Sequence, residues 1–147
     1  MEKVIVKIVR ENDKIELPKY ETAGAAGMDI RANITEPIVL GSLERTLVPT
    51  GLKIAIPEGY EVQVRPRSGL ALKHGLGMAN SIGTIDSDYR GEIGVIAINL
   101  SDKPYTIKPE ERIAQLVLNK VEQIEWVEVT ELGTTERGAG GYGHTGK

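Results

Sequence analysis

Apolar and polar residues alternate with a period of two along most of the chain. The pattern is clear where Leu52, Ile54 and Ile56 are separated by Lys53 and Ala55, and it returns directly afterwards. Such alternation is typical of strands with one buried and one exposed face, and prolines separate many of these segments. We therefore predict strands at residues 4–9, 28–32, 37–40, 46–48, 52–56, 60–65, 92–100, 105–108, 113–119 and 126–129.

Only residues 68–74 have a helical pattern, with Ser68 as a possible N-cap and Gly75 as a C-terminal stop. Many short strands at close spacing are typical of a β-sandwich or barrel. The sequence thus predicts an all-β fold with one short helix. There are no repeats and no linker before about Gly133.

The chain has 147 residues, the length of one ordinary domain. It contains no phenylalanine, so we expect a core of Val, Ile and Leu. A net charge of −3 gives no overall attraction to nucleic acid or anionic lipid, and we expect neither as a partner. The absence of cysteine excludes disulfides and thiolate metal sites. Because no apolar N-terminal run is present, we expect a cytoplasmic protein.

The last eleven residues contain five glycines, Arg137 and Tyr142, and nothing that could pack a core. Glycines let backbone N–H groups approach an anion, while Arg137 offers a forked cation and Tyr142 a flat ring. This combination favours a mobile glycine-rich arm that closes over a nucleotide. A disordered polar terminus is the alternative. Residues 138–143 match G-x-G-x-x-G and residues 141–147 match most of a P-loop, but both motifs need a preceding strand and a following helix.

Arg67 and Ser68 lie where an alternating strand meets the predicted helix. If Ser68 is the cap, its hydroxyl, the first helical N–H groups and the Arg67 guanidinium converge on an anion site. A plain capped helix with a solvated arginine is the alternative.

Residues 80–91 are polar and contain glycine, and they predict a tight β-hairpin that returns into the strand at Ile93. Its backbone groups could pair with the edge of a base. Asp86, beside apolar Ile85, is placed to accept a proton from water. Asp88 is the alternative base, and turn-forming aspartates without a catalytic role are the other interpretation.

Residues 23–29 form a small-residue loop that ends at Asp29. Mg²⁺ prefers carboxylate oxygens, waters and substrate phosphates, so Asp29 could act on such an ion through water, or could simply be a turn residue. Alternation in the strand at 113–119 predicts that Arg112 and Gln115 lie on opposite faces. His74 and His144 have no second ligand at metal spacing.

Five segments follow one another in a specific order: residues 26–29, 66–71, 83–91, 112–116 and 137–143. Together they resemble the five motifs of the trimeric dUTPase family, from about Ala23 to the C-terminus. The resemblance implies a jelly-roll-like β-fold, a homotrimer with shared sites, and Mg²⁺-dependent hydrolysis of dUTP to dUMP and pyrophosphate. This reaction limits uracil incorporation into DNA and supplies dUMP for thymidylate synthesis. Residues 1–132 would be a β-domain with motifs one to four, and residues 133–147 a flexible arm.

The resemblance also implies a role for each matching residue. Asp86 matches the residue that activates water, and Tyr89 the ring that stacks under deoxyribose and blocks a ribose 2′-hydroxyl. Asp29 matches the metal-side aspartate. The positions that would read uracil are Asn80 and the backbone at Thr84, Ile85 and Gly94. The phosphate-side positions are Arg67, Ser68, Gly69 and Gln115. In the arm, Arg137 matches the γ-phosphate arginine, and Tyr142, next to Gly143, stands where the family usually has a phenylalanine over uracil.

Two competing functions stay open. A dCTP deaminase of the same fold relies on a glutamate and an Arg-Ser-Ser motif, whereas this chain has Arg67, Ser68 and Gly69 together with Asp86. A non-catalytic nucleotide-binding trimer is the other candidate. An intact Asp86 and a complete arm favour the hydrolase over both.

Overall fold

The computed structural model describes residues 1–146, so the last position of the P-loop-like match lies outside the described residues. Within them the chain forms short strands and one helix, and every strand pair is antiparallel. The elements are β1 (Lys7–Arg10), β2 (Gly27–Arg31), β3 (Ile38–Leu40), β4 (Arg45–Pro49), β5 (Leu52–Ala55), β6 (Tyr60–Pro66), α1 (Ser68–His74), β7 (Leu76–Met78), β8 (Gly83–Ile85), β9 (Gly94–Asn99), β10 (Tyr105–Ile107) and β11 (Arg112–Lys120).

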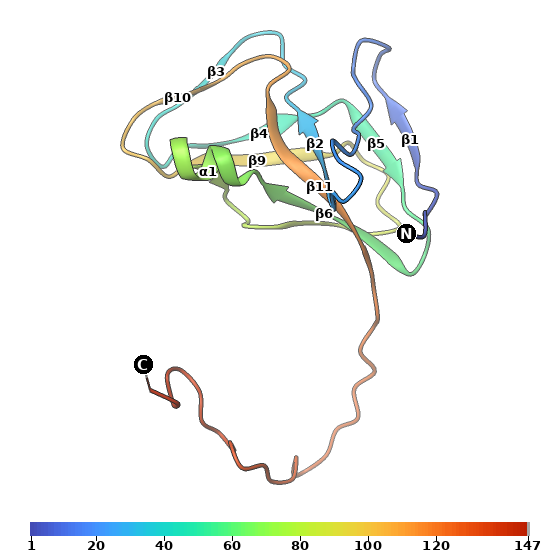
Figure 1. Cartoon of the computed structure of the whole chain (residues 1–147), viewed down its shortest axis with the longest axis vertical. Coiled ribbons are helices and arrows are strands. Elements are labelled where there is room, and N and C mark those ends of the chain that lie inside the picture. Colours follow the sequence, from blue (N-terminus) through green and yellow to red (C-terminus); the bar gives the residue numbers. More distant parts are fainter. Residues whose placement is uncertain (147) are drawn as a thin grey trace.

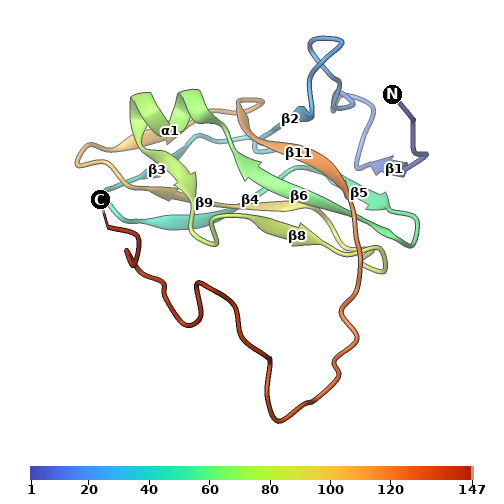
Figure 2. The same ribbon diagram turned by 60° about the horizontal axis from the view of Figure 1, so that its bottom comes forward.

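The strands form a four-stranded sheet in the order β2-β11-β6-β8, a three-stranded sheet β4-β9-β7, and the pairs β1-β5 and β10-β3. Figures 1 and 2 show these sheets packed as layers, with α1 at one end of the body. The core between them is aliphatic, with Ile30 and Val64 from one sheet and Val48 and Val95 from the other almost fully buried. The predicted all-β fold with one short helix is confirmed.

Most predicted strands are present within one to three residues at each end, but the one at residues 126–129 is wrong. No strand occurs between residues 121 and 146, and the chain leaves the body after β11 in a wide arc (Figure 1). The apolar residues Ile124, Trp126, Val127 and Val129 are exposed there. A strand needs a neighbour to satisfy its backbone N–H and C=O groups, and the single chain offers none at this place.

The predicted tight hairpin at residues 80–91 is also wrong. β8 pairs with β6, whereas β9 pairs with β4 and β7. Residues 79–93 therefore form a long connection between neighbouring strands β7 and β9, and it crosses to the other sheet on the way. Ile85 is buried there, which explains why so short a strand joins the larger sheet.

Helix α1 ends at Gly75 as predicted: this residue has φ +68°, and its N–H donates to the Ala71 carbonyl. The start differs, because Arg67 occupies the cap position with extended backbone and Ser68 is the first helical residue, without a side-chain cap bond. Pairing of Pro66 with Ala114 keeps the chain extended up to Arg67, so Ser68 is not the N-cap. No helix within residues 1–146 is long and apolar enough to cross a membrane.

The turn before β11 contains backbone strain. The Glu111 N–H donates to the Lys108 carbonyl at 3.1 Å, with Pro109 second and Glu110 third in the turn. Glu110 has φ +64°, which a type II turn requires at this position and which favours glycine.

Replacement of Glu110 by glycine should stabilise the protein by about 1 kcal/mol, because relief of the left-handed conformation outweighs the added freedom of the unfolded chain. The melting temperature should rise by about 2–4 °C. Glu58→Gly is the control, since exposed Glu58 lies in a turn and has no positive φ. The Glu58→Gly variant should be destabilised, because glycine there only adds freedom to the unfolded chain. Equal changes in both variants would show that Glu110 is not strained.

Candidate active site

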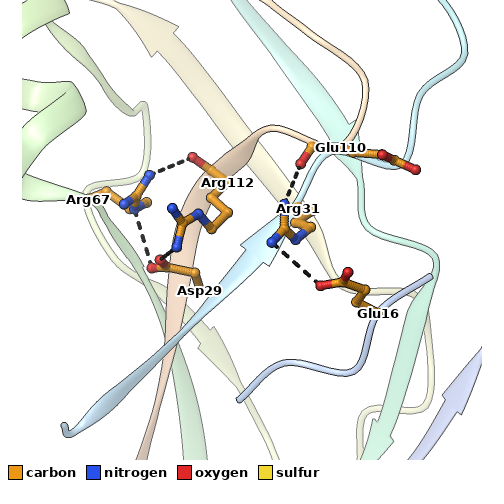
Figure 3. Close-up of polar contacts among 6 residues, drawn as sticks. All are labelled: Glu16, Asp29, Arg31, Arg67, Glu110 and Arg112. Carbon is orange, nitrogen blue, oxygen red and sulfur yellow. Dashed lines mark hydrogen bonds and ion pairs between the residues drawn. The ribbon is translucent and has the colours of Figure 1, made fainter. Parts of the chain in front are cut away.

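Three strands bring four polar residues together at one end of the larger sheet. Asp29 lies on β2, Arg112 and Gln115 on β11, and Arg67 follows β6. Figure 3 shows the Asp29 carboxylate between two guanidinium groups: Arg67 Nε is 3.3 Å from Asp29 Oδ1, and Arg112 Nη1 is 3.4 Å from Oδ2. We call these four residues the arginine cluster.

A β-bulge in β11 makes this arrangement possible. The register with β2 shifts between Arg112 and Ala114, so Arg112 is opposite Arg31 while Gln115 is opposite Asp29. Consecutive residues Ile113 and Ala114 are both buried. Because a bulge adds one residue, Arg112 and Gln115 lie on the same outward face, and the prediction of opposite faces is wrong.

Backbone contacts fix both long side chains. Arg67 Nη1 donates to the Arg112 carbonyl at 3.0 Å, and Gln115 Nε2 donates to the Pro66 carbonyl at 3.1 Å. A Cβ atom at Gly27, which is opposite Val117, would overlap the end of the Gln115 side chain, so glycine leaves room for its present position. The predicted phosphate-side residues Arg67 and Gln115 thus lie with Asp29, while Ser68 and Gly69 follow at the exposed start of α1.

The arginine cluster carries two positive charges and one negative charge and is open to solvent, with 31% of the Arg67 and 42% of the Arg112 side chain exposed. This arrangement can accept an anion. Within residues 1–146 no three His, Asp or Glu side chains lie close enough to hold a metal ion. Since each Asp29 oxygen faces a guanidinium, the residues fit a hydrated Mg²⁺ carried by substrate phosphates, with Asp29 acting through water.

A second set of predicted site residues lies on and after β8. Thr84 pairs with Gln63, Ile85 is buried, and Asp86 follows as an exposed carboxylate. The Tyr89 N–H donates to the Asp86 carbonyl at 3.1 Å and closes a turn. We call residues 80–89 the β8 segment.

Two contacts orient the Tyr89 ring. Its hydroxyl donates to the Glu92 carbonyl at 2.9 Å, and a Cβ atom at Gly91 would overlap the phenol. Tyr89 is 46% exposed, so its ring is accessible to a ligand.

The remaining uracil-side positions differ in their surroundings. The Asn80 amide lies against Gly83, where an added Cβ would be 3.5 Å from Nδ2. Gly94 begins β9 in the other sheet, and an added Cβ there would be 2.6 Å from the Leu47 side chain. The structure thus gives Gly94 a packing role and does not place it in the β8 segment.

A single chain does not bring the arginine cluster and the β8 segment together. Ile85 is opposite Val62, five residues before Arg67, which corresponds to about 17 Å along β6. The arm is separate from both: within residues 1–146 Arg137 Nε donates to the nearby Gly140 carbonyl, at 2.7 Å, and Tyr142 is fully exposed next to Gly143. Figure 1 shows the arm below the body and apart from it.

Sequence reasoning missed two residues beside the arginine cluster. The Tyr105 hydroxyl donates to Glu111 Oε2 at 2.6 Å. Burial raises the pKa of Tyr105 well above its usual value, and the hydrogen bond to the Glu111 carboxylate raises it further, so the phenol stays protonated. In the sequence Tyr105 is one apolar position of a short strand, and nothing there indicates a polar role.

Comparisons with known proteins agree with this fold. A family model described as dUTPase matches residues 13–146. The deoxyuridine 5′-triphosphate nucleotidohydrolase of Fusobacterium nucleatum is 70% identical over 147 residues, covering 100% of both chains. Among solved structures, the Staphylococcus bacteriophage 80alpha dUTPase with dUPNHPP superposes with a TM-score of 0.88 at 26% identity, covering 99% of this chain and 100% of the phage protein. A variant dUTPase of phage phi11 of S. aureus, with a TM-score of 0.79, 23% identity and coverage of 89% and 100%, is described as coordinating a structural Mg(II) ion.

Proposed function

The chain belongs to the dUTPase family, and from this premise we propose which of its residues carry out the reaction. The enzyme hydrolyses dUTP to dUMP and pyrophosphate on a jelly-roll-like β-fold. The observation that carries the residue assignment is the arginine cluster, in which Arg67 and Arg112 flank Asp29 at a solvent-open end of the sheet.

In our proposal Asp86 is the general base. Its carboxylate is exposed directly after buried Ile85, free to take a proton from the water that attacks the α-phosphorus. Attack adds negative charge to a group that is already anionic, so fixed cations stabilise the transition state. Arg67 and Arg112 bind the phosphate chain with Ser68, Gly69 and Gln115, and Arg137 meets the γ-phosphate when the arm closes. Mg²⁺ bound with the triphosphate would neutralise further charge, with Asp29 orienting its waters.

The β8 segment supplies selectivity. Asn80 and the backbone at Thr84 and Ile85, together with the backbone of Gly94 at the start of β9, pair with the uracil edge, and the exposed Tyr89 stacks under deoxyribose. Tyr142, with Gly143 beside it, covers the base when the arm closes. Tyrosine in place of the usual phenylalanine keeps the stacking face.

We propose that the active unit is a homotrimer in which different copies supply the parts of each site. The separation of about 17 Å along β6 between the arginine cluster and the β8 segment supports this, and the contacts of Arg67 are with Asp29 and the Arg112 carbonyl. Apolar side chains on the surface also support it: Leu47 on the outer face of β4 is 65% exposed, and Trp126, between β11 and the arm, is 85% exposed.

We divide the chain functionally into a β-domain of residues 1–132 and a flexible arm of residues 133–147. In the single chain the departure from the body comes earlier, at Val121. Residues 121–132 are therefore proposed to order against another copy. The enzyme is proposed to act in the cytoplasm, where nucleoside triphosphates are used.

Pyrophosphate release assayed with dUTP, dTTP, UTP and dCTP tests the proposed pocket. We expect kcat/KM to be at least ~10²-fold higher for dUTP than for the other three, because the groups of the β8 segment match uracil and Tyr89 excludes a 2′-hydroxyl. Equal hydrolysis of dTTP or UTP would contradict the pocket. Release of ammonia from dCTP would favour the deaminase, and binding of dUTP without turnover would favour a non-catalytic trimer.

A further inference from the structure

Tyr105 joins helix α1 to the start of β11. Its half-buried ring packs against His74 at the end of α1, with ring centroids 5.2 Å apart and planes at 49°. Its hydroxyl donates to Glu111 Oε2 at 2.6 Å. A hydrogen bond of this length to a carboxylate is of the strong, charge-assisted kind.

Glu111 is held immediately beside the arginine cluster. Its carbonyl accepts from the Ala32 N–H at 2.8 Å, and the next residue is Arg112, whose own carbonyl accepts from Arg67. The charge of Arg67 also acts on the Tyr105 phenol and partly offsets the rise in its pKa. The Glu111 carboxylate is thus bonded to a phenol that lies within reach of the Arg67 charge, and it belongs to the residue before Arg112. Among residues 1–146 it forms no ion pair with either arginine.

The net charge of the arginine cluster makes the position of the Glu111 carboxylate important. Arg67 and Arg112 against Asp29 leave the cluster with one net positive charge. A second carboxylate paired with either arginine would remove that charge and occupy donors that a phosphate needs. A carboxylate beside a cationic cluster is attracted to it unless another donor holds the carboxylate.

We propose that Tyr105 is a positioning residue: its hydroxyl holds the Glu111 carboxylate away from Arg67 and Arg112 and so keeps both guanidinium groups available for the triphosphate. This inference rests on the proposed function of the arginine cluster. In this proposal Tyr105 acts through Glu111 and does not contact the substrate.

Tyr105→Phe tests the proposal, because it keeps the ring on His74 and removes only the hydroxyl. We expect KM for dUTP to rise about tenfold, the scale of one hydrogen bond to a charged group, while kcat stays within about twofold. Adding Glu111→Gln to this variant should restore KM, since the amide has no charge to compete with phosphate. Tyr60→Phe is the matched control. Tyr60 is also half-buried, but it lies at the end of β6 that is far from Arg67, so the KM of this variant should not change.

Equilibrium binding of inorganic pyrophosphate to the same variants separates this inference from the proposed function. Weaker binding by Tyr105→Phe, restored in the double variant, supports the inference even if turnover is lost for another reason. An unchanged pyrophosphate affinity and KM in Tyr105→Phe would overturn it, as would a weakened affinity that Glu111→Gln does not restore, because the hydroxyl would then have only a structural role. Failure of the wild-type protein to hydrolyse dUTP would instead refute the proposed function.

Discussion

Replacement of Asp86 by asparagine is expected to lower the turnover of dUTP at least ~10²-fold, the usual scale for loss of a general base. Asparagine has nearly the same shape but cannot take a proton from water. Because Asp86 is exposed and no side chain of residues 1–146 hydrogen-bonds to its carboxylate, the melting temperature should not change. Single-turnover and steady-state assays of pyrophosphate release measure the effect.

Asp88→Asn is the matched control for that experiment. Asp88 lies two residues further on, is also exposed, and is the alternative base suggested by the sequence. Its variant should hydrolyse dUTP almost normally. Near-normal turnover of Asp86→Asn together with an inactive Asp88→Asn would transfer the role to Asp88.

Removal of the arm is expected to have an effect of similar size. A chain that ends at Thr135 should keep its melting temperature and oligomeric mass but lose turnover by about 10²-fold or more, since it lacks the charge stabilisation of Arg137 and the exclusion of water. The hydrogen bonds found within residues 136–146 are local, such as Gly140 N–H to the Arg137 carbonyl at 3.2 Å. Closure costs on the order of 1 kcal/mol of backbone entropy per residue fixed, so contacts with nucleotide must offset it.

Calorimetry, light scattering and the dUTP assay together examine the truncated chain. Arg137→Ala in the full-length chain is the matched variant, because it removes one cation and keeps the glycines. It should lose part of the turnover lost on truncation. An unfolded truncated protein would make the arm structural, and unchanged turnover would contradict its closure over the substrate.

The sequence was sufficient to predict the strands of the body because the alternation of core residues is local information. The positions of residues such as Leu52 and Ile54 indicate the buried face of a strand from within one segment. The strand at residues 126–129 was predicted wrongly for the same reason: its alternation is present, but the partner that would complete a sheet is not in the single chain. An alternating pattern shows which residues of a segment can be buried, but it does not show which neighbouring strand or surface buries them.

The site was predictable as a set of residues and much less so as geometry. The order of five motifs identified Asp29, Arg67 and Gln115, and the resemblance to the dUTPase family is confirmed. The bulge between Arg112 and Ala114 was not predictable, because simple alternation assumes an unbroken ladder. Tyr105 and Glu111 meet only through folding of the turn before β11, and no motif contains both.

The central claim is that each site combines Asp86 of one copy with Arg67 of another, and mixing two inactive variants tests it most directly. Asp86→Asn and Arg67→Ala are to be unfolded, mixed in equal amounts, refolded together and assayed with dUTP. Random assembly gives a site with both native residues about one quarter of the time, one half times one half, so we predict about a quarter of wild-type activity in the mixture. If both residues of a site come from one chain, no site is complete, and a mixture as inactive as its separate components would contradict the account.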